Sequence, residues 1–266
     1  MNKVAKVNFR FWVMKICATT LGETGGDLLS MTLKIGYAMS STILFGLFLV
    51  SFIAQVASKK FNPSLYWIVI LTTSTVGTTI SDFMDRTLKL GYAHGSLILV
   101  SCLFAVLTIW YLSEKSLSVN NIQTTKEQCF YWTAILFSNT LGTALGDFLA
   151  DSSGLGFLGG AVLIGSLIGL VVLAFYFTKI NRVSLFWIAF VLTRPFGATF
   201  GDFLTKPIAK GGLNFGTVGS SFILALILIV LIIYTSIKYK QTQAMQDNTK
   251  FNAILKKDAL EQETSC

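Results

Sequence analysis

Four aspartates lie at equivalent positions of the chain, and other oxygen-bearing side chains precede them. The aspartates are Asp27, Asp82, Asp147 and Asp202. Further oxygen ligands are available from Glu23, Thr78, Asn139 and Thr143. Carboxylate, hydroxyl and amide oxygens suit Mg²⁺, Ca²⁺, Mn²⁺, Na⁺ or a proton better than zinc or copper. These residues therefore predict a cation-binding site or pathway, with the four aspartates as candidate metal ligands.

A structural role for the aspartates is the alternative. An aspartate at a helix end can cap the loop that follows, and threonines in membrane helices commonly bond to preceding carbonyl groups of their own helix. However, an ionisable residue inside a membrane is costly and is a functional candidate by default. We therefore expect the acids to act in cation binding or transport.

Two basic residues, Lys15 and Arg194, lie in the same predicted membrane segments as these acids. Glu23 and the four aspartates make five acids, so acids outnumber bases by three in these segments. If the groups face one another, the pocket attracts cations and Arg194 balances one acid. Lys15 either joins this charge balance or extends its amine to the cytoplasmic surface.

Long apolar segments must position these residues. The chain is 53% hydrophobic and only 13% charged, unlike an ordinary soluble domain. A helix of about 20 apolar residues crosses a membrane. We predict eight spans, at Phe9–Leu28, Ala38–Ala57, Leu65–Met84, Ala93–Leu112, Phe130–Leu149, Leu158–Thr178, Leu185–Leu204 and Phe215–Ile237.

The eight spans are four copies of a two-helix unit. Each copy has a tryptophan fifteen residues before its aspartate, namely Trp12, Trp67, Trp132 and Trp187. Small residues stand five and one positions before each aspartate, and these are Gly22 and Gly26, Gly77 and Ser81, Gly142 and Gly146, and Gly197 and Gly201. Small residues four positions apart let helices pack closely. Because each unit crosses the membrane twice, all copies have the same orientation, with pseudo-fourfold or two-plus-two symmetry.

These motifs resemble a known family. The pairs FW, YW, YW and FW are followed by GETGGD, GTTISD, GTALGD and GATFGD, and the likeness covers about Phe9–Ile237. The chain resembles bacterial membrane proteins made of four tandem two-helix repeats, known as repeat of unknown function 347. The resemblance implies an all-helical architecture of eight transmembrane helices and implies no activity.

The tryptophans are expected to anchor the spans at the cytoplasmic membrane interface. Trp and Tyr are enriched at membrane–water interfaces. At 1.5 Å per residue, each aspartate then lies about 22 Å above its tryptophan. The carboxylates would lie in the outer third of the membrane or at its outer boundary.

Basic residues indicate the orientation. Loops on the side of the N-terminus carry fourteen of them and the opposite side carries five, so both termini should be cytoplasmic, in a bacterial inner membrane. The net charge of +8 follows from this topology and from anionic lipid, so we expect no nucleic-acid partner. We divide the chain into two repeats at 1–112, a cytoplasmic linker at 113–129, two repeats at 130–237 and a cytoplasmic tail at 238–266, which we expect to be disordered or a short surface helix.

We hypothesise a transporter or channel for a small cation, with manganese or magnesium as first candidates. Its partners would be the lipid bilayer and a small inorganic cation, and a homo-oligomer is left open. No nucleotide-binding loop, nucleophile–base pair or paired cysteines stand out, so we expect no enzyme and no cofactor. The alternatives are a non-transporting scaffold or sensor with a solid core, and a carrier of a small organic cation, which needs an aromatic-lined pocket.

Overall fold

The protein is all-helical. A computed structural model describes residues 3–58 and 60–264, and these contain no β-strand. The long helices are α1 Phe9–Asp27, α2 Tyr37–Ala57, α3 Pro63–Asp82, α4 Gly91–Glu114, α5 Thr125–Asp147, α6 Gly156–Phe177, α7 Arg182–Thr205 and α8 Gly216–Thr264. Short π-helical turns, Leu28–Thr32, Phe83–Thr87 and Phe148–Ser152, continue α1, α3 and α5. Short 3₁₀ turns lie at Val119–Asn121 and Ile208–Lys210.

Within the described residues, five of the long helices are apolar enough to cross a membrane. They are α2, α4, α6, α7 and the Gly216–Gln246 part of α8. α1, α3 and α5 have a similar length but carry more polar side chains, most of which are buried. Buried polar side chains lower the mean hydropathy of a helix without exposing it to water. The chain is a multi-pass membrane protein.

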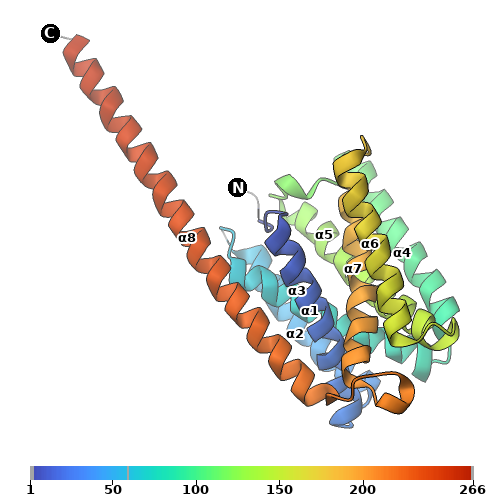
Figure 1. Ribbon diagram of the computed structural model, residues 1–266. Helices are drawn as coiled ribbons and strands as arrows, with labels where there is room; N and C mark the ends of the chain where they lie inside the picture. Colours follow the sequence, from blue (N-terminus) through green and yellow to red (C-terminus); the bar gives the residue numbers. More distant parts are fainter. Residues whose placement is uncertain (1–2, 59, 265–266) are drawn as a thin grey trace.

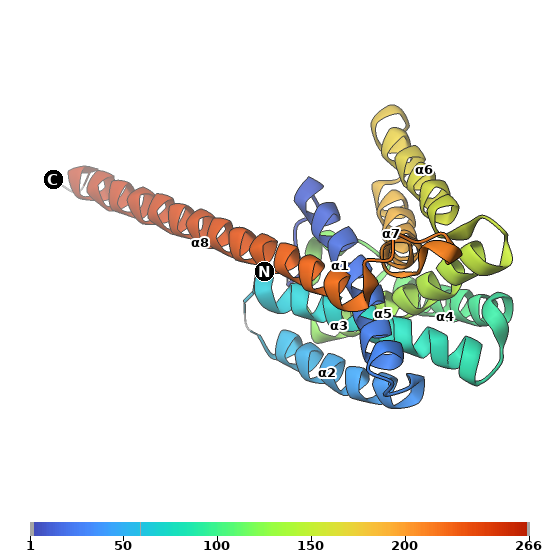
Figure 2. The same ribbon diagram turned by 60° about the horizontal axis from the view of Figure 1, so that its bottom comes forward.

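The helices form an inner ring and an outer layer. α1 and α5 each contact both α3 and α7, which closes a ring of four helices (Figure 2). α2 packs on α3, α4 on α5, α6 on α7 and α8 on α1. The apolar segments of α2, α4 and α6 are only 22% buried, against 61% for α7. The outer helices therefore present their apolar side chains to the surroundings, as lipid-facing helices do.

Glycines allow close contact between neighbouring helices of the ring. A Cβ on Gly22 would overlap Ser74 of α3, and one on Gly77 would come within 3.0 Å of the backbone of Asn139 in α5. The same relation recurs around the ring, where Gly142 lies against Arg194 and Pro195 of α7, and Gly197 lies against Thr19 of α1. Each of these glycines thus faces the next helix of the ring.

The small residues directly before the aspartates lie one turn further along. A Cβ on Gly26 would come within 2.8 Å of Thr78, and one on Gly146 within 2.8 Å of Ala198. A Cβ on Gly201 would come within 3.1 Å of the Cβ of Glu23. The fourth small residue, Ser81, is buried and donates a hydrogen bond to Asp85 at 3.4 Å. Small side chains therefore bring the helices together just where the acids lie.

Three of the four repeat tryptophans are buried inside the bundle, which differs from their expected role as interface anchors, and Trp12 is half-buried. Trp67 and Trp132 are each 1% exposed, and Trp187 is 6% exposed. Each repeat tryptophan contacts the aromatic residue that precedes the tryptophan of the previous repeat. The ring pairs are Phe11–Trp67, Tyr66–Trp132 and Tyr131–Trp187, and Phe186–Trp12 completes the circle. The reason is that these aromatics begin the inner helices, whose sides are covered by neighbouring helices rather than by lipid.

The C-terminal tail continues α8 instead of forming a separate surface helix. α8 runs without interruption to Thr264 and extends well past the other helices (Figure 1). Its apolar part packs on α1, so the last helix of the chain lies against the first.

Candidate functional site

The four aspartates lie together at one end of the inner ring. Three of them are the last residues of α1, α3 and α5, and the fourth lies near the end of α7. All four are buried, with exposed fractions of 2–3%. The continuation of each helix past its aspartate in α1, α3 and α5 places the residue four positions later over the same face of the helix.

Two bases, each four residues after an aspartate, bind the four aspartates in pairs. Arg86 contacts Asp82 and Asp147, each at 3.0 Å. Lys206 contacts Asp27 at 2.6 Å and Asp202 at 3.0 Å. Each base therefore joins the aspartate of its own repeat to that of the following repeat around the ring.

Arg86 and Lys206 were missed as site residues because the sequence suggested that both lie outside the spans. Their spacing gives a signal, since each stands four residues after its aspartate, where helical ion pairs form. The corresponding residues in the other two repeats are Met31 and Asp151. The excess of three acids counted only Lys15 and Arg194 as bases; when Arg86 and Lys206 are added, the folded site holds five acids and four bases.

A second polar layer lies about one turn deeper, around Glu23 and Arg194. Their side chains are 3% and 0% exposed, and Arg194 Nη1 lies 3.0 Å from Glu23 Oε2. Arg194 Nη2 donates hydrogen bonds to the hydroxyls of Thr78 at 2.6 Å and Thr143 at 2.7 Å. Both threonines donate to Glu23 Oε2 at 3.3 Å. Each of the four inner helices therefore supplies one of these four side chains to the layer.

A third polar layer contains Lys15 and Asn139. Lys15 is fully buried and donates a hydrogen bond to Asn139 Oδ1 at 3.2 Å. The amide nitrogen of Asn139 donates to Thr73 at 3.0 Å and to Ser74 at 3.3 Å. The ammonium group also lies 4.0 Å from the ring centre of Phe190. Lys15 therefore points into the bundle and does not extend to the surface.

Three carboxylates approach one another between the first two layers. Ligand oxygens of Glu23, Asp147 and Asp202 all lie within 4.8 Å of one another, and all three residues are buried. Three carboxylates from different helices provide the ligand type that Mg²⁺ and Mn²⁺ prefer. Because Arg86, Arg194 and Lys206 also bind these acids, a cation that entered would compete with at least one tethered base.

The outer bases are the least buried members of the site. The side chains of Arg86 and Lys206 are 29% and 18% exposed. The guanidinium of Arg86 lies near the rings of Tyr37 and Tyr92, at 6.0 and 5.9 Å from their centres. It also donates a hydrogen bond to the Tyr37 hydroxyl at 3.3 Å. These two tyrosines were not among the predicted site residues.

The comparisons with known proteins identify the repeats. The family model described as Repeat of Unknown Function (DUF347) matches residues 10–61, 65–116, 130–181 and 185–239. No curated protein and no solved structure matches the chain. Since the four matches cover most of the sequence, the chain belongs to the family of proteins built from this repeat.

Proposed function

We propose that the protein is a carrier for a small divalent cation, with manganese or magnesium as the preferred substrates. The observation that supports this most is the convergence of Glu23, Asp147 and Asp202, with ligand oxygens within 4.8 Å of one another inside the helical ring. In this proposal all eight long helices cross a bacterial inner membrane, both termini are cytoplasmic, and the four repeats surround one pathway.

The cost of the buried charges favours transport over a purely structural role. Removing ions from water is expensive, and buried ion pairs can often be replaced by apolar side chains without loss of stability. A scaffold would gain little from Lys15, Glu23, Arg194 and four aspartates along its axis. Ionisable residues in membrane helices usually mark substrate or ion pathways.

Closure at both ends favours a carrier over an open channel. At the end opposite the aspartates, the tryptophans and the aromatic residues before them form an aromatic layer across the ring. In this layer the hydroxyls of Tyr66 and Tyr131 lie 2.6 Å apart. On the other side Arg86 and Lys206 cover the aspartates. In the proposed cycle a cation enters at the aspartate end and displaces one of these bases toward water, and the aromatic layer then separates to release it.

A small organic cation is the second candidate, and Arg86 itself is the observation that favours it. Its guanidinium is held by Asp82, Asp147, Tyr37 and Tyr92. Carboxylates and aromatic faces together are a common way to bind an organic cation. A free guanidinium compound offers the same groups as the side chain that occupies this position.

Uptake into liposomes distinguishes these possibilities. Purified protein would be reconstituted, and uptake of Mn²⁺, Mg²⁺ and methylguanidinium measured for the wild type, for Asp147→Asn/Asp202→Asn and for Glu127→Gln. We expect the double variant to lower Mn²⁺ or Mg²⁺ uptake by on the order of tenfold or more, as when ligands of a metal site are disturbed. Glu127 caps the beginning of α5, far along the helix from Asp147, and glutamine can take the same capping role, so its variant should match the wild type.

The other outcomes have clear meanings. Uptake of methylguanidinium alone would replace the metal by an organic cation. No uptake of any cation by well-folded protein would contradict transport and leave the scaffold or sensor role.

A further inference from the structure

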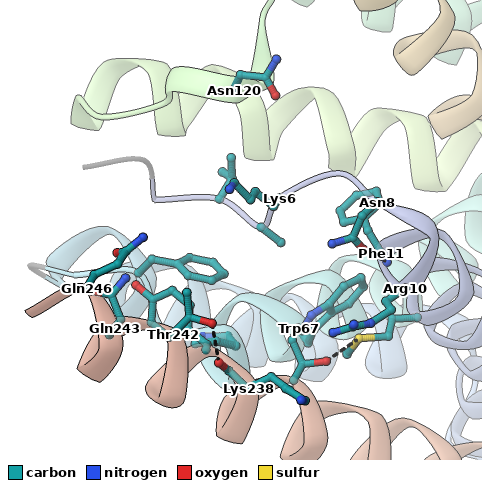
Figure 3. Close-up of a pocket in the computed structure, with 17 residues that line it drawn as sticks. Lys6, Asn8, Arg10, Phe11, Trp67, Asn120, Lys238, Thr242, Gln243 and Gln246 are labelled. Atoms are coloured by element: carbon teal, nitrogen blue, oxygen red, sulfur yellow. Dashed lines mark hydrogen bonds between the residues drawn. The ribbon is translucent and has the colours of Figure 1, made fainter. Parts of the chain in front are cut away.

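A cavity of about 650 Å³ lies at the end of the bundle opposite the aspartates. It is open on one side and is bordered by the N-terminal segment, the beginnings of α1 and α3, and α8 from Thr235 onward (Figure 3). Its volume is within the range of small-molecule sites. The buried side chains of Phe11, Met14 and Trp67 contribute apolar surface to it.

The charged side chains that line the cavity are all basic. They are Lys6, Arg10 and Lys238, and the described lining residues include no acid. All three are exposed, and none forms an ion pair within the described part of the chain. The guanidinium of Arg10 lies 5.5 Å from the ring centre of Tyr234. Three cations without acidic partners around an apolar surface favour an anionic ligand that also has an apolar part.

The position of the cavity indicates the source of this ligand. α8 beside it exposes apolar side chains, with Ile233 54% and Ile237 52% exposed. Lys238 follows directly, at the point where the apolar part of the helix ends. This change from apolar to basic side chains is typical of the boundary between acyl chains and headgroups in the membrane.

We infer that the cavity binds the headgroup phosphate of an anionic phospholipid, whose acyl chains lie along the exposed apolar face of α8. Lys6, Arg10 and Lys238 contact the phosphate, and the N-terminal segment and α8 are held together by the shared ligand. This site is separate from the acid cluster and does not depend on cation transport.

Lipid binding to purified protein tests the inference. Native mass spectrometry in detergent would measure the affinity for phosphatidylglycerol and for zwitterionic phosphatidylcholine. The variant is Lys6→Gln/Arg10→Gln/Lys238→Gln. The matched control is Lys115→Gln/Lys179→Gln/Arg182→Gln, which removes the same charges from exposed positions outside the cavity. Each basic side chain near a membrane surface raises the affinity for anionic lipid about fivefold. The loss of three should therefore weaken binding of phosphatidylglycerol on the order of a hundredfold.

The control should retain its preference for phosphatidylglycerol. An equal loss in both triple variants would mean nonspecific surface attraction and would overturn the site. Binding of water-soluble glycerol phosphate as tightly as the lipid would also overturn it, because the apolar surface and α8 would then contribute nothing.

Discussion

At the scale of single residues, the site is defined by which positions carry a base. The four aspartates are equivalent in the sequence, but only two repeats have a base four residues later, Arg86 and Lys206. Each of these bases contacts two aspartates, so two bases are enough for four acids. The first repeat has Met31 in the corresponding position. This position of the repeat therefore accommodates an uncharged side chain.

Replacing Arg86 with methionine should make stability depend on a free cation. The Arg86→Met variant leaves Asp82 and Asp147 without their shared base, and an unpaired buried charge costs about 3–5 kcal/mol. If the acids accept a metal, Mn²⁺ should restore much of this loss. The measurement is thermal unfolding in detergent with and without MnCl₂, with Lys210→Met at an exposed position as the control. An Mn²⁺ effect equal to that on the control would argue against metal binding by these acids.

At the scale of helices, the ring depends on glycines that let neighbouring backbones approach. The glycine five residues before each aspartate faces the next helix. At Gly142 the neighbours are the side chains of Arg194 and Pro195, so the same contact positions a charged residue of the site. Close packing and charge placement are therefore linked.

Adding one methyl group at this contact should destabilise the protein. A Cβ in Gly142→Ala would overlap Arg194, and overpacking of this kind costs about 1–3 kcal/mol. Gly169→Ala on α6 is the matched control, since nothing lies within 4 Å of its Cβ position and alanine favours the helix by up to about 1 kcal/mol. Thermal unfolding of the two variants should move in opposite directions. Equal stability would contradict the close contact between α5 and α7.

At the scale of the whole molecule, the chain closes on itself. The last helix, α8, packs on α1, and the hydroxyls of Thr32 and Thr217 lie 2.6 Å apart across this contact. Apolar outer helices surround the polar ring, an order of layers that suits lipid outside and a polar axis inside. In water, this order of layers would expose most of the apolar surface.

Labelling of single cysteines tests the proposed orientation. In a cysteine-free background, a membrane-impermeant thiol reagent should label Thr32→Cys in intact cells, because this exposed residue lies at the aspartate end. Lys60→Cys, in the loop between α2 and α3, should be labelled only after the cells are opened. The reverse pattern would place both termini outside the cytoplasm.

The sequence by itself determined the helices, the repeats and the acids. Apolar segments set the helix positions to within a few residues, except that α8 continues past the predicted span to Thr264. The fixed spacing of tryptophan, glycine and aspartate identified the repeating unit, because both signals are local. The tertiary structure decided how the charges pair and where the aromatic side chains point. Arg86 reaches Asp147, and Arg194 reaches Glu23, only because the helices close into a ring. Ring closure also buries Trp67, Trp132 and Trp187, which the sequence had assigned to the membrane interface, since a side chain's surroundings depend on its neighbours in space.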